Sequence, residues 1–291
     1  MNGDRTVRRT RLQCLLAAIV ATAAVVMTGC GGGGGPGASA DGPGPEHVHG
    51  LGINPADSAL YIATHTGLFR MERGSESAER VGDRLQDTMG FAVVGSDHFL
   101  GSGHPDLRDG LPPLLGLIES RDAGRSWRPI SLLGEADFHA LRSSGDHVRG
   151  YDASGGRLMT SEDAGRSWTE HAPPEALIDV VVDPADPQRI VAAGASGLHM
   201  SGDGGRSWRA LPGEAALLAW PVPDRLYAVG LDGDLRVSGD GGRSWAALED
   251  VPGEPAAVTA PDGRALIVAL HDGAFVSTSD GGRTWGDGAW S

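Results

Sequence analysis

The stretch SGDGGRSW at residues 201–208 occurs again at 238–245 and, with small changes, three more times in the chain. The other copies are SRDAGRSW at 120–127, SEDAGRSW at 161–168 and TSDGGRTW at 278–285. The shared pattern is Ser/Thr-x-Asp-x-Gly-x-x-Trp, and its aspartates, 41, 40, 37 and 40 residues apart, are Asp122, Asp163, Asp203, Asp240 and Asp280. A repeat of about 40 residues is typical of one four-stranded propeller blade. The spacing therefore predicts an all-β propeller.

Each repeat also carries two apolar, β-rich runs before its Asp-containing turn. In the fourth unit these are residues 178–182 and 189–193. One further pair, 48–53 and 60–64, precedes the first copy of the motif and has no such turn after it. Residues 46–291 therefore hold six units, which predicts a six-bladed propeller with the turn between the third and fourth strands of most blades. How the ring closes stays open, because the run after Trp285 is very short.

The composition excludes two classes of partner. The formal net charge is −14, and every basic side chain is arginine. An acidic surface repels a phosphate backbone, so we expect no nucleic-acid binding, and it also disfavours electrostatic adhesion to an anionic lipid surface. The two cysteines, Cys14 and Cys30, both precede the repeats, so the predicted domain has no disulfide framework.

The N-terminus has the features of an export signal. A basic segment containing Arg8 and Arg9 leads into an uncharged apolar run from Cys14 to Met27, which is short for a membrane-spanning helix. The run ends in Met-Thr-Gly-Cys at 27–30, which resembles a bacterial lipobox. We expect residues 1–29 to be a lipoprotein signal peptide, Cys30 to carry lipid, and the Gly/Pro-rich residues 30–45 to be a tether. The propeller, residues 46–291, would then be held extracytoplasmically at the cell membrane.

The repeated turn has a chemistry that explains its residues. We expect the carboxylate and the hydroxyl to accept hydrogen bonds from backbone N–H groups, the glycine to take a positive φ, and the tryptophan to pack on its own or the neighbouring blade. The motif resembles the Asp-box, and the chain resembles the BNR-repeat, sialidase-like propeller superfamily. In those families the box lies on the face away from the active site. The resemblance implies that the five aspartates and the five tryptophans are structural.

The opposite face gathers histidines. Propeller topology brings the starts of the innermost strands and the ends of the second strands to one mouth. Counting from the turns, we expect the inner strands to begin at His49, Met89, His139, Asp179, Ala216 and Ala256, and the second strands to end near His65, His104, Asp152, Gly194, Asp232 and His271. His47 lies two residues before His49 and can share its strand face.

Imidazole, thioether and carboxylate groups converging on one concave place are the ligands of a transition-metal site. We therefore predict a candidate metal set of His49, His65, His104, His139 and His271. Methionine beside histidine would suit copper and aspartate beside histidine would suit zinc, and the sequence does not choose between them. A polar ligand funnel without a metal is the alternative.

Further ligand contacts are predicted around the same mouth. The long loop from Pro105 to Leu114 would hang over it and present Asp106 and Arg108. Met89 and Tyr151 complete the predicted ligand-binding set. Sialidases need an arginine triad and a Tyr/Glu pair, and the chain has no Phe-Arg-Ile-Pro segment and no glutamate placed to activate Tyr151.

The segments HVHGL (47–51), ATHTGLF (63–69), MGF (89–91), SGHP (102–105) and ADFHAL (136–141) resemble secreted bacterial propellers classed as glycosyl-hydrolase-like BNR proteins. Three functions stay open on this basis. The first is ligand binding at the histidine funnel, with one copper or zinc ion in one version. The second is glycoside hydrolysis, for which Asp152 and Asp179 are the best carboxylate pair. The third is non-catalytic protein binding, as in the photosystem II assembly factors and sortilin-type receptors that share the fold.

Overall fold

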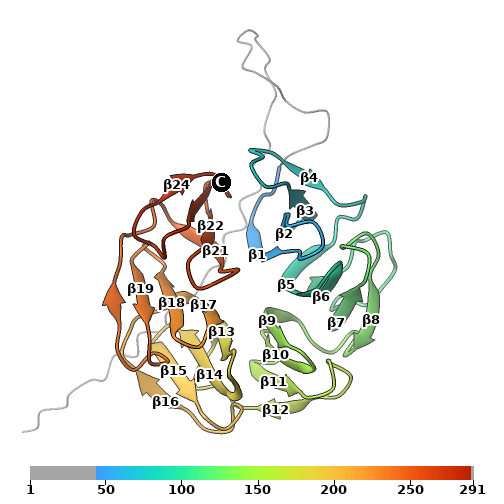
Figure 1. Ribbon diagram of the computed structural model, residues 1–291. Helices are drawn as coiled ribbons and strands as arrows, with labels where there is room; N and C mark the ends of the chain where they lie inside the picture. Colours follow the sequence, from blue (N-terminus) through green and yellow to red (C-terminus); the bar gives the residue numbers. More distant parts are fainter. Residues whose placement is uncertain (1–43, 290–291) are drawn as a thin grey trace, which may run out of the picture. The chain divides into compact units, whose positions relative to one another are not determined.

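The computed structural model describes residues 44–289, which form 24 strands and no helix. The strands make six four-stranded antiparallel sheets, each built from strands that neighbour one another along the chain. Figure 1 shows the sheets arranged as a ring. The predicted six-bladed, all-β propeller is confirmed. No helix long and apolar enough to cross a membrane occurs in this part of the chain.

The first three blades cover the green and blue half of the ring in Figure 1. Blade one comprises β1 (Val48–Ile53), β2 (Leu60–Thr64), β3 (Gly67–Met71) and β4 (Ala78–Arg80). Blade two comprises β5 (Asp87–Gly95), β6 (His98–His104), β7 (Leu117–Ser120) and β8 (Arg128–Ser131). Blade three comprises β9 (Phe138–Ser144), β10 (His147–Asp152), β11 (Arg157–Ser161) and β12 (Thr169–His171).

The remaining three blades complete the ring. Blade four comprises β13 (Leu177–Asp183), β14 (Asp186–Gly194), β15 (Gly197–Ser201) and β16 (Arg209–Leu211). Blade five comprises β17 (Ala216–Val222), β18 (Arg225–Gly230), β19 (Leu235–Ser238) and β20 (Ala246–Ala247). Blade six comprises β21 (Pro255–Thr259), β22 (Leu266–Leu270), β23 (Phe275–Thr278) and β24 (Gly286–Asp287). The predicted signal peptide, Cys30 and all but the last residues of the predicted tether lie outside the described residues.

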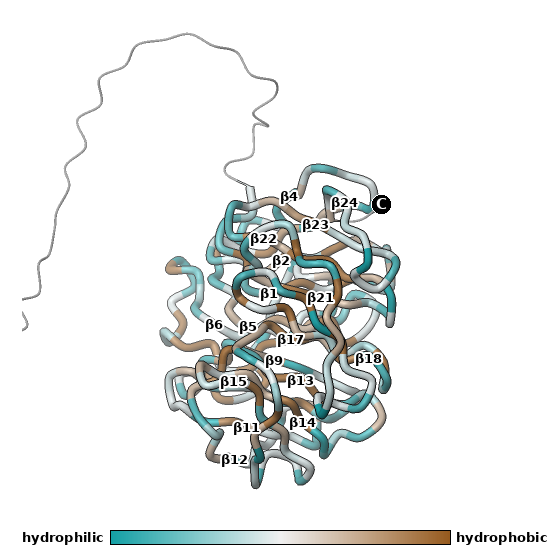
Figure 2. The backbone as a smooth tube through the Cα atoms, turned by 90° about the vertical axis from the view of Figure 1, so that its left-hand side faces the viewer, coloured by the Kyte–Doolittle hydropathy of each residue, from teal (hydrophilic) through white to brown (hydrophobic). Residues whose placement is uncertain are grey.

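The core is divided among the seams between blades. Each of the six hydrophobic clusters joins residues of two neighbouring blades. Strand β2 shows how one strand serves two seams, because Leu60 and Ile62 pack toward blade six while Tyr61 and Ala63 pack toward blade two. Side chains alternate along a strand, so a strand buried on both faces must be apolar at every position. Figure 2 shows apolar residues along the strands and polar residues in the loops.

The ring closes by side-chain packing. Blade six contains β21 to β24 in chain order and blade one begins with β1, so the described residues exchange no strand between these sheets. The seam between them is filled by Ile62 and Phe69 of blade one and Ile267, Ala269 and Phe275 of blade six. Closure therefore depends on buried apolar area and not on backbone pairing.

The five repeated turns lie between the third and fourth strands, as predicted. In the second-blade turn, Asp122 Oδ1 accepts from the Ser126 N–H at 2.8 Å, and Ser120 Oγ accepts from the Gly124 N–H at 2.8 Å. The same bonds recur in the other four turns. Three tryptophans donate to the preceding blade: Trp168 to Ser131 Oγ at 2.9 Å, Trp245 to Pro212 O at 2.8 Å and Trp285 to Glu249 O at 3.0 Å.

The turns lie on the face opposite the inner-strand starts. In blade two the turn is bonded to the connection between the first two strands, where the Ala123 N–H donates to Asp97 O at 3.0 Å. Blade three has the equivalent bond from Ala164 to Asp146 O at 2.8 Å. The aspartates and tryptophans of the repeat therefore build the far face, and the mouth is left to other residues.

Candidate metal centre

The inner strands of all six blades line a central channel of about 800 Å³. Five of these strands begin with a β-bulge, in which one residue is left out of the pairing. The bulged residues, all of which line the channel, are His49, Met89, His139, Ile178 and Ala256. Bulges of this kind re-aim a side chain and are common beside functional sites. They direct His49, Met89 and His139 to one sector of the channel mouth.

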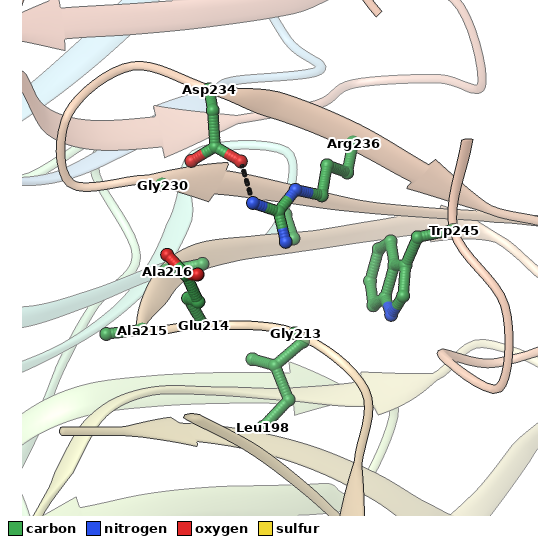
Figure 3. A pocket seen from close by; sticks show the side chains of 10 residues that line it. Leu198, Gly213, Glu214, Ala215, Ala216, Gly230, Asp234, Arg236 and Trp245 are labelled. Atoms are coloured by element: carbon green, nitrogen blue, oxygen red, sulfur yellow. Dashed lines mark ion pairs between the residues drawn. The ribbon is translucent and has the colours of Figure 1, made fainter. Parts of the chain in front are cut away.

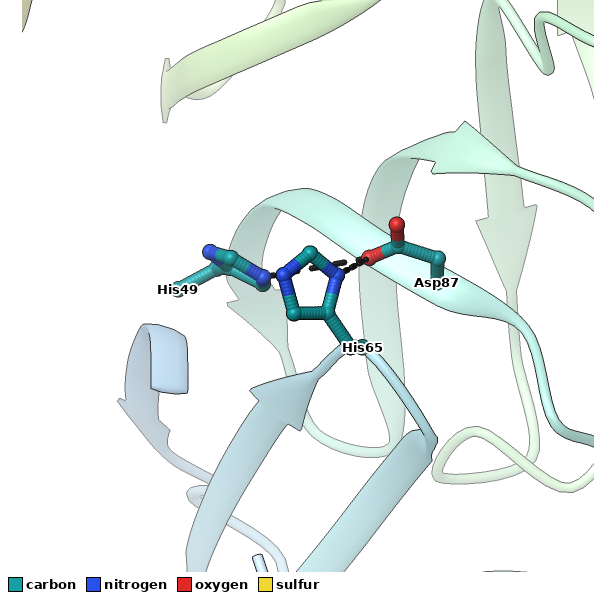
Figure 4. A group of neighbouring side chains, drawn as sticks. All are labelled: His49, His65 and Asp87. Atoms are coloured by element: carbon teal, nitrogen blue, oxygen red, sulfur yellow. Dashed lines mark ion pairs between the residues drawn. The ribbon is translucent and has the colours of Figure 1, made fainter. Parts of the chain in front are cut away.

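The first cluster consists of His49 from β1, His65 just after β2, and Asp87 at the start of β5 (Figure 4). Their candidate ligand atoms lie within 4.8 Å of one another. His65 Nδ1 lies 2.9 Å from Asp87 Oδ1, and His49 Nε2 lies 3.8 Å from the same oxygen. His49 Nε2 and Asp87 Oδ1 are both buried; His49 Nε2 has no hydrogen-bond partner within the described chain, and Asp87 Oδ1 is ion-paired with His65. Buried polar atoms of this kind call for an explanation.

The electrostatics keep the His49 ring neutral. Burial and the neighbouring His65 ring lower the pKa of His49 to about 4. At neutral pH one of its two ring nitrogens therefore carries a lone pair. His47, in a left-handed backbone conformation with φ of 52°, places its ring 5.3 Å from that of His65 and adds a third imidazole beside the pair.

The geometry of this cluster fits a transition-metal ion. Two ligands that each lie about 2.1 Å from a tetrahedral zinc ion are about 3.4 Å apart. The separations of 2.9 and 3.8 Å to Asp87 Oδ1 bracket that value. Two imidazoles and one carboxylate would supply three ligands to a tetrahedral ion, the number that catalytic zinc sites use.

A second cluster lies at the next seam. Asp137 immediately precedes β9, and its Oδ2 lies 2.9 Å from His139 Nε2 and 3.7 Å from His104 Nε2. The hydrogen bond from His139 to Asp137 raises the pKa of that imidazole. The structure thus brings together His49 with His65, and His104 with His139, in two neighbouring groups that each centre on a carboxylate.

Neither central carboxylate is among the residues predicted from the sequence. Asp87 lies two residues before the bulged residue Met89, and Asp137 lies two residues before the bulged residue His139. The sequence does contain a pattern that could have pointed to Asp87 and Asp137. His47 likewise lies two residues before a bulged residue, His49. Alternation at period two places all three side chains at the mouth.

Two predicted carboxylates occupy other places. In blade four the bulged residue is Ile178, so Asp179 lies one residue beyond the expected start. Asp179 is buried between blades, where it accepts from Arg142 at 2.7 Å and from the Leu218 N–H at 2.9 Å. Burial raises the pKa of Asp179. A slip of one residue turns a side chain to the other face of a strand.

Asp152 shows the same slip. Asp152 pairs with Phe138, as Gly103 pairs with Thr88 in blade two. It therefore lies one residue before the position that His104 holds there. Asp152 is fully buried and accepts from the Asp137 N–H at 3.0 Å and from Arg157 Nε at 2.8 Å. Burial alone would raise its pKa, but these hydrogen bonds lower it. Asp152 therefore anchors the backbone of Asp137. The carboxylates of Asp152 and Asp179 both accept hydrogen bonds from the protein itself.

The predicted loop contacts also have structural partners. Arg108 donates to both oxygens of Asp106, which accepts from the Leu85 N–H at 2.8 Å, so the pair ties the loop to the connection between blades one and two. Tyr151 is buried in the seam between blades three and four. Within the described residues the His271 side chain has no ion pair, ring contact or hydrogen bond, and its backbone N–H donates to Glu254 O at 2.9 Å.

A smaller pocket lies between blades four and five, beside the start of β17 and the end of β18. Figure 3 shows Asp234 paired with Arg236 there, at 2.6 Å, beside Trp245. Its volume of about 10 Å³ is that of roughly one water molecule. The pocket is therefore too small for a sugar ring or any other organic ligand.

Comparison with known proteins shows the fold alone. No protein-family model and no curated protein matches the chain. Among solved structures, a GH74 enzyme from Niastella koreensis gives a TM-score of 0.61 at 16% identity over 84% of this chain and 45% of that one. The GH74 xyloglucanase from Xanthomonas campestris gives 0.56 at 18% over 84% and 45%, and YCF48 from Cyanidioschyzon merolae gives 0.52 at 14% over 84% and 86%. The chain spans less than half the length of these GH74 enzymes.

Proposed function

We propose that the protein is an extracytoplasmic, lipid-anchored propeller that binds a transition-metal ion, zinc or copper, at the channel mouth through His49, His65 and Asp87. The observation that carries the proposal is that His49, His65 and Asp87 each bring one ligand atom within 4.8 Å of the others, with His49 Nε2 and Asp87 Oδ1 both buried. A cation between them would satisfy both at once, whereas each is costly to bury alone.

The charge balance supports a cation at this place. The lowered pKa of His49 keeps that imidazole, 3.8 Å from Asp87 Oδ1, neutral at pH 7. Metal ligands must be deprotonated, so a neutral histidine beside a carboxylate is ready to bind without first losing a proton. His49 lines the channel and the His65 side chain is 44% exposed, so a bound ion would remain accessible to solvent or to a further ligand.

The test is the metal content of the full chain, purified in detergent, equilibrated with excess zinc and dialysed. We expect at least one equivalent of zinc to remain, and one equivalent fewer in the His49→Ala/His65→Ala variant. His171→Ala is the matched control, because His171 lies on the outer strand β12 and is bonded to Thr160. The control should retain as much zinc as the wild type.

Two results would overturn the proposal: no retained zinc in the wild type, or equal retention in the double variant and the control. Either would favour a function that needs no metal, glycoside hydrolysis or partner binding. The anchor is tested on the same material, because Cys30→Ser should move the protein from the membrane fraction to the aqueous fraction. An unchanged membrane fraction would show that Cys30 is not the anchor.

A further inference from the structure

The exposed large apolar side chains of the described residues all lie on the mouth face. This face holds the starts of the inner strands, the connections that lead from each blade to the next, and the turns between second and third strands. The five side chains that lie there are Leu85, Leu107, Leu111, Ile178 and Leu231. Single exposed hydrophobic residues are ordinary on a protein surface, but their gathering on one face marks an interaction surface.

Three of these side chains lie on two loops beside blade two. Leu85 lies in the connection between β4 and β5, and Leu107 and Leu111 lie in the connection between β6 and β7. We call these three residues the leucine ridge. Leu107 is 98% exposed, so the fold itself gains nothing from burying it. Leu231 lies in blade five, which is across the ring from blade two (Figure 1), so apolar side chains flank the mouth on opposite sides.

The two loops that carry the ridge are fastened to each other. The Leu85 N–H donates to Asp106 Oδ2 at 2.8 Å, and Arg84 pairs with Asp109 at 2.6 Å. Arg108 pairs with Asp106 at 2.6 Å and holds that carboxylate in place. The leucines are therefore presented on loops held by charge-assisted hydrogen bonds, and a partner that covers them has less loop motion to freeze on binding.

The mouth face is also the more acidic of the two. Its strand connections contain thirteen acidic residues and two arginines, whereas those of the far face contain thirteen acidic residues and eight arginines. Both arginines of the mouth, Arg84 and Arg108, are already paired with aspartates. The exposed acidic residues there are Asp83, Glu135, Glu214, Asp232, Glu249, Asp250, Glu254 and Asp272. A partner that fits this face must therefore bring positive charge.

This charge decides between the occupants that could cover the ridge. A second copy of the chain would place an acidic face against the acidic mouth, and like charges across an interface cost affinity. An anionic lipid surface is repelled in the same way. A protein segment with both apolar and basic side chains meets both features, because its apolar groups cover the ridge and its charges face the acidic loops.

We propose that the mouth face is a docking surface for a protein segment that carries both basic and apolar side chains. The leucine ridge is its apolar contact, and the exposed acidic residues around the mouth are its charged rim. No residue of the proposed zinc or copper site takes part in these contacts, so the inference stands apart from the proposed function.

The experiment selects displayed short random peptides against the full chain in detergent, with a metal chelator added in one arm. We expect the enriched sequences in both arms to combine arginine or lysine with leucine or phenylalanine. A peptide synthesised from such a sequence should bind about tenfold more weakly to the variant Leu85→Ser/Leu107→Ser/Leu111→Ser. The three side chains are exposed, and circular dichroism checks that the variant is folded.

A second variant tests the charged rim. Asp83→Asn/Glu135→Gln removes two exposed charges from the connections on either side of blade two. It should weaken binding about threefold at low salt, and the difference should shrink as salt is added. The matched control is Asp146→Asn/Asp224→Asn, which removes two exposed charges from the far face and should bind as the wild type does.

The proposal is overturned by enrichment of acidic peptides, by no enrichment at all, or by equal affinity of the wild type and the leucine variant. Binding that vanishes with the chelator would assign the peptide to a bound metal ion and overturns it too. Adhesion of the Cys30→Ser chain to phosphatidylglycerol vesicles that the three leucine changes abolish would assign the ridge to lipid instead of protein. A wild type without zinc would overturn the proposed function and leave this docking surface intact.

Discussion

Aspartate serves two opposite purposes in this protein, and the difference lies in what each carboxylate accepts. The turn aspartates are surrounded by donors, as in Asp163, which accepts from the Ser167 hydroxyl at 2.7 Å and the Ser167 N–H at 2.8 Å. At the mouth, Asp137 Oδ1 is buried without a donor among the described residues, and Asp87 Oδ1 faces only the imidazoles of His65 and His49. A carboxylate saturated by the fold stabilises the fold, and one left unsaturated is available to a ligand.

The first prediction concerns the turns and pH. The Ser167 hydroxyl and N–H groups lower the pKa of Asp163 to about 2, below its ordinary value of 3.8. A lowered carboxylate pKa contributes stability that is present above pH 3.8 and is lost as the pH falls through about 2. Asp163→Asn should therefore lower Tm at pH 6, and the difference from the wild type should shrink toward pH 2. Thermal melts followed by circular dichroism measure this.

The control for this prediction is Asp250→Asn, because Asp250 is exposed. It should leave Tm unchanged across the same pH range. A Tm difference for Asp163→Asn that stays constant from pH 6 to pH 2 would show that the charge of Asp163 does not stabilise the turn.

At the scale of the element, the bulge at the start of five of the inner strands decides which residue faces the channel. The bulge in β5 depends on Gly103 of β6, which has a φ of 132°. A Cβ at Gly103 would fall against Asp87 O and 2.8 Å from Met89 N. Glycine is needed here because the two backbones approach closely, beside both clusters.

The second prediction is that Gly103→Ala disturbs both clusters. The added methyl group must push the backbone of Asp87 and Met89 aside, so we expect loss of zinc retention and a destabilisation of about 2–3 kcal/mol. Urea unfolding and metal analysis measure the two effects. Gly273→Ala is the control, because Gly273 also has a positive φ, 89°, but open space around it. Full zinc retention by Gly103→Ala would mean that the bulge does not position the ligands.

At the scale of the whole molecule, each of the six seams between blades is filled by an apolar cluster. Within residues 44–289 every sheet consists of four consecutive strands, so no blade contributes a strand to another blade. The blades are stabilised locally, but the channel exists only when all six seams are formed. The seam between blades six and one joins residues near opposite ends of the propeller, so its formation costs the most chain entropy.

The third prediction tests this closing seam. Ile267 is fully buried there, so Ile267→Ala should lower the free energy of unfolding by about 2–4 kcal/mol through lost burial and the cavity that remains. Ile178→Ala is the control, because Ile178 is 37% exposed at the channel, and it should cost less than about 1 kcal/mol. Urea denaturation of both variants gives the values. Equal costs would show that the closing seam is not tightly packed.

The sequence by itself determined the blade. The turn motif, the two apolar runs before it and the period near 40 residues are local information, and they predicted six blades, the place of the turns and the face on which the histidines gather. Strand pairing within a blade involves neighbouring segments, so a single repeat contains what is needed to predict it.

The tertiary structure alone decided which side chains meet. The bulges shifted the register by one residue from that expected, and Asp152 and Asp179 are engaged in buried contacts. Asp87 and Asp137 became the centres of the two clusters because each reaches across a seam to a histidine of the preceding blade. Such contacts depend on how two blades pack, and a one-residue shift reverses the face of a side chain, so no spacing within a single repeat encodes them.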